Sequence, residues 1–186
     1  MFTINDINEL LQEHMTEEGF KFWKALEEKV PPIWERPSSS TGKYHKKDNG
    51  IVQTIADHTY EMLYVCEKCI KIFNIPDKTR ESDVLYLGII LHDRFKFGIH
   101  NPLYAKHTDR NHDRIAANTV IYNKDKFSKI LSENQIIKLE EMLRFHSGKW
   151  SSDATTNFSF KNLKPETLFV HILDMLSTNN LLKVGD

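Results

Sequence analysis

The chain is organised around one segment, Gly88-Ile89-Ile90-Leu91-His92-Asp93-Arg94-Phe95-Lys96. An apolar run that begins at Val84 carries His92 and Asp93 to its end, and Lys96 follows shortly after them. Adjacent residues on a helix point about 100° apart, so this pair can reach one metal ion only where the helix ends or bends. The Asn101-Pro102 break favours such an end. Taken alone, the segment fits equally well a metal site or a helix C-terminus with a charged histidine and a solvated aspartate.

The composition is that of a chain long enough to form one domain with its own core. It has 186 residues, of which 40% are hydrophobic, and a formal net charge of −1. There is therefore no overall basic field of the kind that drives non-specific nucleic-acid binding. No apolar run approaches the roughly 20 residues that span a bilayer, and the first residues lack the pattern of a signal peptide. We expect a cytoplasmic protein without a membrane partner.

Apolar periodicity predicts an all-α chain. The expected helices cover residues 3–15, 16–30, 50–73, 81–93, 112–123, 132–146 and 165–182. Residues 33–49 are expected to form a loop, and this loop carries three lysines together with Tyr44 and His45. Such a loop could approach an anionic substrate through Lys43, Lys46 and Lys47, or it could be an ordinary solvated surface.

Five of the predicted helical segments carry a histidine or an aspartate on the inward face or at the helix end. These residues are His58, His92 with Asp93, His112, His146 and Asp174. One histidine on an apolar face is usually a core residue whose ring proton is taken by a backbone carbonyl. Five such sets are hard to explain by packing alone. Imidazole and carboxylate are ligands for divalent metals, so the pattern predicts a metal site at the centre of a helical bundle.

The same residues resemble the motifs of the HD-domain superfamily of metal-dependent phosphohydrolases. The matching phrases are Ala56-Asp57-His58-Thr59, Leu91-His92-Asp93-Arg94-Phe95-Lys96, His112-Asp113-Arg114-Ile115-Ala116-Ala117, His146-Ser147-Gly148-Lys149-Trp150 and Leu173-Asp174-Met175-Leu176. The resemblance covers residues 43–182 and implies an all-α HD-domain helical bundle with a central metal site. Residues 1–42 would then be N-terminal helices and a loop that pack on a catalytic core of residues 43–186, all within one structural domain.

The sequence departs from the family pattern at several positions. Arg94 and Phe95 replace the usual small or apolar pair after His-Asp, which places charge and bulk near the metal. Of the paired histidines that often precede the first helix, only His45 is present. A strict count from a helix start at Gly50 puts the first ligand at Thr54, one turn before His58. The Asp-His-Thr context and the apolar stripe favour His58.

The resemblance also implies roles for individual residues. His58, His92, Asp93 and Asp174 would hold a first ion, and His112 and His146 a second one, with Asp93 bridging. The cofactor would be one or two divalent ions (Mn, Fe, Ni, Co, Zn or Mg) that activate water and hold a phosphate. Asp93 and Lys96 are the implied catalytic residues, and Lys96 would stabilise charge on the phosphoryl oxygens. The candidate substrate contacts are Arg94, Lys149, His45 and Lys46, and Arg110 and Arg114 are further basic residues that are either helpers or solvated surface groups.

The implied activity is hydrolysis of a phosphate ester bond of a nucleotide, an EC 3.1 reaction. One alternative is a phosphodiesterase or 3′–5′ exonuclease that acts on cyclic dinucleotides or short single-stranded nucleic acid. Trp34, Tyr44 and the loop lysines support it, because aromatic rings stack bases and lysines follow phosphates. An alternative of another class is a catalytically inactive nucleotide-binding sensor in which Arg94 fills the substrate space. Trp23, Trp34 and Phe158 could be core or interface residues, which leaves a homo-oligomer open.

Overall fold

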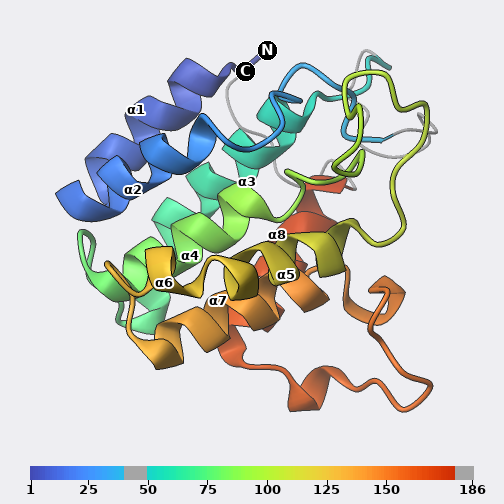
Figure 1. The fold of residues 1–186 in the computed structure, drawn as a ribbon. Coiled ribbons are helices and arrows are strands. Elements are labelled where there is room, and N and C mark those ends of the chain that lie inside the picture. Colours follow the sequence, from blue (N-terminus) through green and yellow to red (C-terminus); the bar gives the residue numbers. More distant parts are fainter. Residues whose placement is uncertain (40–49, 179–186) are drawn as a thin grey trace.

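A computed structural model describes residues 1–39 and 50–178, and this part of the chain is all-helical, as the sequence predicts (Figure 1). The elements are α1 (Ile4–His14), α2 (Glu17–Glu27), α3 (Ile55–Cys69), α4 (Arg80–Leu91), α5 (His112–Tyr122), α6 (Lys124–Phe127), α7 (Glu133–Phe145) and α8 (Pro165–Thr178), with short 3-10 helices at Ile70–Phe73, Gly148–Trp150 and Phe160–Asn162. Within the described ranges the only β-type pairing is an isolated antiparallel bridge between Pro37 and Thr54. None of the described helices combines the length and the apolar character needed to cross a lipid bilayer.

The third helix begins later than its sequence pattern suggests. Thr54 is its N-cap: the Thr54 side chain accepts a hydrogen bond from the Asp57 backbone, and the Asp57 side chain accepts one from the Thr54 backbone. Because this reciprocal capping box satisfies two free backbone donors, α3 starts at Ile55 and the predicted start at Gly50 is wrong. Ile51, which a helix start at Gly50 would include, is 54% exposed. Thr54 is thus occupied as a cap, and His58 lies in the second turn of the helix.

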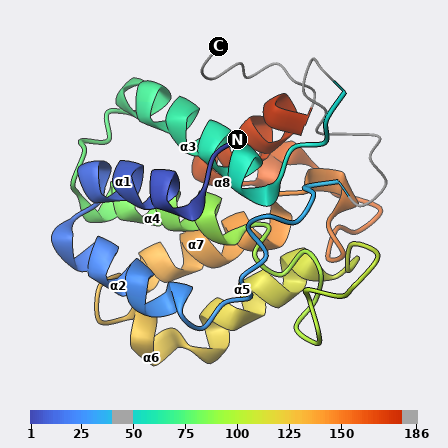
Figure 2. The ribbon, with the colours of Figure 1, turned by 90° about the horizontal axis from the view of Figure 1, so that it is seen from above.

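Helix α4 is the central element of the bundle. All of its residues from Ser82 to Leu91 are buried, which fits a helix that is apolar on every side. It packs against α3, α7, α8 and α2, and Figure 2 shows it running through the middle of the molecule. A helix in this position delivers the residues at its C-terminal end to the interior.

The N-terminal helices share this core. Helix α1 packs on α3 and α2 packs on α4. The Asp83 carboxylate of α4 accepts hydrogen bonds from the backbone N–H and the hydroxyl of Thr16, the N-cap of α2. Trp23 is fully buried and its ring meets that of Trp34 edge-on, at 6.2 Å between centroids, so both tryptophans are core residues.

Two predicted boundaries lie outside the described residues. They are the division between residues 42 and 43 and the end of the last helix at residue 182. Helix α6 was not expected from the sequence, and it follows α5 after a single residue, Asn123. The remaining helices agree with their predicted ranges to within a few residues, with Ser132 as the N-cap of α7.

Candidate metal centre

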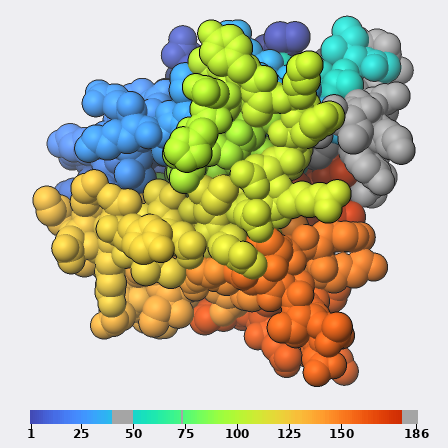
Figure 3. Space-filling model, turned by 45° about the vertical axis from the view of Figure 1, so that its right-hand side comes forward, coloured from blue at the N-terminus to red at the C-terminus, as the bar shows by residue number. Residues whose placement is uncertain are grey.

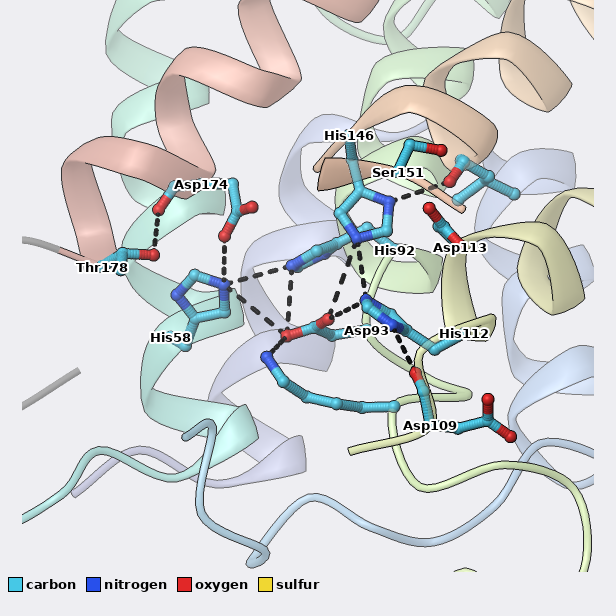
Figure 4. Close-up of polar contacts among 12 residues, drawn as sticks. His58, His92, Asp93, Asp109, His112, Asp113, His146, Ser151, Asp174 and Thr178 are labelled. Carbon is cyan, nitrogen blue, oxygen red and sulfur yellow. Dashed lines mark hydrogen bonds and ion pairs between the residues drawn. The ribbon is translucent and has the colours of Figure 1, made fainter. Parts of the chain in front are cut away.

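The six predicted ligand residues meet at the centre of the bundle (Figure 4). They come from five elements: His58 from α3, His92 and Asp93 from the end of α4, His112 from the start of α5, His146 from the end of α7 and Asp174 from α8. Helix α4 ends at Leu91 with His92 as its C-cap, so Asp93 lies in the turn beyond it. The prediction that the helix ends at this pair is confirmed, and the ending lets both side chains face the same space.

Three of these side chains form a first group of donors. The Nε2 atoms of His58 and His92 lie 3.1 Å apart. Oδ2 of Asp93 lies 3.6 Å from Nε2 of His92 and 3.9 Å from Nε2 of His58. Asp174 adds a carboxylate oxygen 3.2 Å from Nε2 of His58.

A second group is built around the other oxygen of the same aspartate. Oδ1 of Asp93 lies 3.4 Å from Nε2 of His112 and 3.9 Å from Nε2 of His146. The two imidazole nitrogens are 3.2 Å apart. The donor atoms within each group lie within 4.8 Å of one another. Metal–ligand distances of about 2.0–2.2 Å place tetrahedral donors about 3.3–3.6 Å apart, so both groups have dimensions suited to an ion.

The outer nitrogens of three rings are held by backbone carbonyls. Nδ1 of His92 lies 2.5 Å from the Ile89 carbonyl and Nδ1 of His146 lies 2.8 Å from that of Leu143. Nδ1 of His112 lies 2.9 Å from the Asp109 carbonyl. A carbonyl can only accept, so each Nδ1 carries a proton and each Nε2 presents its lone pair to the centre. Lone pairs about 3 Å apart repel each other unless a proton or a cation lies between them.

Burial keeps two of the imidazoles neutral at physiological pH. Burial lowers the pKa of His92 from 6.5 to about 4, because the loss of solvation outweighs the attraction of the Asp93 charge, and His146 and His58 add to the lowering. Burial and the neighbouring His112 also lower the pKa of His146. Neutral imidazole is the form that binds metals, so neither ring needs to lose a proton first.

The charged forms are favoured at Asp93, Asp174 and His112. Burial opposes ionisation of Asp93, but Lys96 and the imidazoles outweigh it and hold the pKa of Asp93 well below its usual range. Burial is likewise outweighed at Asp174, where the hydrogen bond and charge of His58 lower the pKa. At His112, the hydrogen bond to Asp93 overcomes burial and raises the pKa. The two ionised carboxylates supply negative charge that suits a cation, whereas His112 has to release its Nε2 proton before it can bind one.

The centre reaches solvent at one edge. The His112, Asp174 and Lys96 side chains are 13%, 16% and 12% exposed, whereas that of Asp93 is 4% exposed. Nζ of Lys96 lies 2.5 Å from Oδ2 of Asp93, so the predicted catalytic lysine contacts the shared ligand. Figure 3 shows one outer face of the molecule, with the loop of residues 98–111 in lime, α5 in yellow and residues 147–160 in orange.

Arg94 does not face the metal centre. Its guanidinium lies over the Trp34 ring, 3.7 Å from Cζ to the ring centroid, and Nη2 donates to the Pro31 carbonyl. The residue is 1% exposed. This position corrects the expectation of an arginine in the substrate space, because the cation–π contact holds the side chain against the N-terminal segment.

The remaining basic residues expected at the site either have contacts outside the ligand set, are exposed, or are undescribed. Lys149 is exposed, with Nζ 4.7 Å from the centroid of the Trp150 ring. Arg114 bonds to Asp153 and to the Ser152 carbonyl, which ties α5 to the segment after α7. Arg110 is exposed. His45, Lys46, Lys43 and Lys47 lie outside the described residues.

Sequence reasoning missed the residues that support the ligands from behind. Nδ1 of His171 donates to the His146 carbonyl at 2.6 Å and so holds the C-terminal turn of α7. Ser177 lies behind His58 and contacts Glu61. The sequence does contain one indication for Glu61, because its carboxylate stands three residues after the predicted ligand His58.

No family model, curated protein sequence or solved structure matches this chain.

Proposed function

We propose that the protein is a metal-dependent phosphohydrolase of the HD type that hydrolyses a phosphate ester bond of a nucleotide. The observation that carries this proposal is the position of Asp93, whose two oxygens face two separate histidine pairs. Such a set of donors fits two divalent ions that share one carboxylate, or one ion in either group. Mn, Fe, Ni, Co, Zn and Mg all suit these ligands.

The metal supplies a Lewis acid that activates water and neutralises charge on the phosphate. The protein supplies rings that are already oriented by their Nδ1 hydrogen bonds and that are neutral where burial keeps them so. Asp93 and Asp174 supply the negative charge that offsets the cations. Preorganised ligands of this kind lower the cost of assembling the reactive geometry.

Lys96 is the residue proposed to act on the substrate. Its ammonium pairs with Oδ2 of Asp93. Asp93 would help to hold a divalent ion, and the Lys96 ammonium beside it would donate hydrogen bonds to a phosphoryl oxygen of the substrate. A fixed cation beside developing negative charge is commonly worth a factor of about 10²–10³ in rate.

The substrate we favour is a nucleotide that presents a terminal phosphate. The most exposed side chain among the six ligand residues, Asp174, is only 16% exposed, and the chain has no net positive charge that would hold a long polyanion. A cyclic dinucleotide or a single-stranded oligonucleotide is the alternative that the substrate assay must separate. The position of Arg94 against Trp34 removes the reason to expect an occluded, inactive sensor.

The test is release of phosphate or nucleoside from a panel of nucleotides, cyclic dinucleotides and short single-stranded oligonucleotides. Mn²⁺, Co²⁺, Ni²⁺ and Mg²⁺ are added in turn, and the Asp93→Ala variant is run beside the natural chain. Turnover that disappears in the variant supports the proposal and identifies the substrate class. Absence of turnover across the panel with metal bound contradicts it, and nucleotide binding without turnover then indicates a sensor.

A further inference from the structure

A buried carboxylate lies directly behind the metal centre. Glu61 is on α3, one turn after His58, and is buried. Among the described residues its hydrogen-bond donors are neutral: the Ser177 hydroxyl at 2.9 Å and the Gln53 amide at 2.6 Å. Burial raises the pKa of Glu61, and these two donors oppose the rise. A buried carboxylate with neutral partners is costly unless a positive charge nearby compensates for it.

Ser177 connects the Glu61 carboxylate to the metal centre. Oγ of Ser177 lies 2.8 Å from Nδ1 of His58. The single hydroxyl proton is directed to Glu61, so Oγ is left to accept the Nδ1–H of His58. The result is a continuous chain of hydrogen bonds from the Glu61 carboxylate through Ser177 to the His58 ring, and Nε2 of that ring points to the centre.

This arrangement distinguishes His58 from the other three rings. Within the described residues, the Nδ1 atoms of His92, His112 and His146 meet only neutral peptide carbonyls. A carboxylate that acts through a hydrogen bond on one nitrogen of a ligand imidazole makes the other nitrogen of the ring a stronger electron-pair donor to a metal. It also fixes the orientation of the ring. The group that contains His58 therefore has an electrostatic advantage that the His112 and His146 group lacks.

This chain of hydrogen bonds, from Glu61 through Ser177 to His58, is also held in place at its outer end. Gln53, which donates to Glu61, accepts hydrogen bonds at its own backbone carbonyl from the amide and the hydroxyl of Ser38, at 2.9 and 3.0 Å. The segment before α3 thereby holds the Gln53 side chain against the carboxylate. A carboxylate fixed from both sides keeps one position relative to His58.

We propose that Glu61 is a positioning residue that acts through Ser177 to strengthen metal binding at the group of His58, His92, Asp93 and Asp174, so that this group fills before the group of His112 and His146. The proposal rests on the metal centre of the proposed function, but not on its substrate. It concerns affinity, so it is tested without an activity assay.

The experiment is a Mn²⁺ titration of the full chain in which unbound ion is followed by its electron paramagnetic resonance signal. The variants are Glu61→Gln, Ser177→Ala and the double variant, and Glu67→Gln is the control on the same helix, where Glu67 pairs with Lys68. We expect Glu61→Gln and Ser177→Ala each to weaken the tighter Mn²⁺ site about 10–100-fold. The weaker site and the control should keep the constants of the natural chain.

The double variant separates a relay from a general packing effect. Because Glu61 acts through Ser177, adding Glu61→Gln to Ser177→Ala should weaken binding no further. Additive weakening, equal weakening of both sites, or unchanged binding by Glu61→Gln overturns the proposal. If Glu61→Gln fails to fold by circular dichroism, Ser177→Ala alone decides between weakened and unchanged tight binding. No binding by the natural chain would contradict the metal centre itself.

Discussion

The Nε2 atoms of His112 and His146 lie 3.2 Å apart at the centre of the bundle, with each Nδ1 already bonded to a peptide carbonyl. The Nε2 atoms of His58 and His92 lie 3.1 Å apart on the other side of Asp93, with Nδ1 of His58 facing the Ser177 hydroxyl and Nδ1 of His92 facing the Ile89 carbonyl. Facing nitrogen lone pairs at this distance need a proton or a cation between them. The two pairs are the strongest reason to regard the core as a metal centre.

Metal binding should therefore stabilise the fold. A ligand at about 100 times its dissociation constant adds about 2.7 kcal/mol to the free energy of unfolding, which for a chain of this size raises Tm by about 5–10 °C. Differential scanning fluorimetry with Mn²⁺ or Zn²⁺, against a sample treated with a chelator, measures the shift. An unchanged Tm at saturating metal would mean that the ligand cluster binds none of the ions tried.

Lys96→Ala should separate catalysis from metal binding. The ammonium pairs with a ligand oxygen, so its loss leaves Asp93 more available to metal while removing the proposed phosphoryl contact. We expect kcat to fall about 10²–10³-fold with metal affinity unchanged or higher. Lys21→Ala, which removes an exposed ion pair with Glu17 on α2, is the matched control. A loss of metal affinity parallel to the loss of turnover would refute the proposed role.

The metal-free chain should lose stability as the pH falls. The pKa of His92 is 6.5 in its ordinary state and about 4 when folded, so between these values the unfolded chain binds the additional proton. The contribution of His92 to stability is therefore complete above pH 6.5 and falls by up to about 3 kcal/mol as the pH approaches 4. His146 acts in the same direction.

The contribution of His112 to stability changes with pH in the opposite direction, and it does so in a different pH range. Its folded pKa is raised above 6.5, so its contribution is complete below pH 6.5 and is lost only as the pH rises. The His112 contribution therefore does not offset the stability that the chain loses as the pH falls. Urea unfolding midpoints of chelator-treated protein from pH 7.5 to 4.5 test the sign, and a midpoint that rises on acidification would contradict it.

Gly19→Ala tests the packing of α2 on α4. An alanine Cβ at this position would lie 2.5 Å from Cγ and Oδ2 of Asp83, the carboxylate that holds the Thr16 cap. Alanine favours helix by up to about 1 kcal/mol, but the clash with a buried side chain should outweigh it. We expect a net loss of about 1–3 kcal/mol in urea unfolding, with Lys21→Ala close to the natural chain. A more stable Gly19→Ala variant would show that Asp83 moves at little cost.

That the six residues meet at the centre was predictable because their signals in the sequence are local. Each ligand follows an apolar run or lies on an apolar stripe, and His92 with Asp93 stands at a helix end that the sequence marks clearly. The start of α3 was misjudged because Gly50 is a conspicuous helix breaker, whereas the capping box at Thr54 and Asp57 is decisive only when both residues are read together.

The features that sequence reasoning missed depend on contacts between distant segments. Glu61 and Ser177 are 116 residues apart, and nothing local indicates that they meet. Arg94 turns toward Trp34 and Pro31 because the N-terminal segment passes beside the end of α4, a path that no periodicity records. A basic residue beside a ligand was reasonably expected at the site, but its direction is set by tertiary packing.

The measurement that bears most directly on the metal centre is the number of Mn²⁺ ions bound by the natural chain and by Asp93→Asn. Asparagine keeps the size of the side chain but removes the charge that both donor groups share. The exposed Asp125→Asn is the control. We predict that the natural chain and the control bind Mn²⁺, and that Asp93→Asn loses affinity at both groups. Equal binding by Asp93→Asn and the natural chain would contradict a shared carboxylate at the centre.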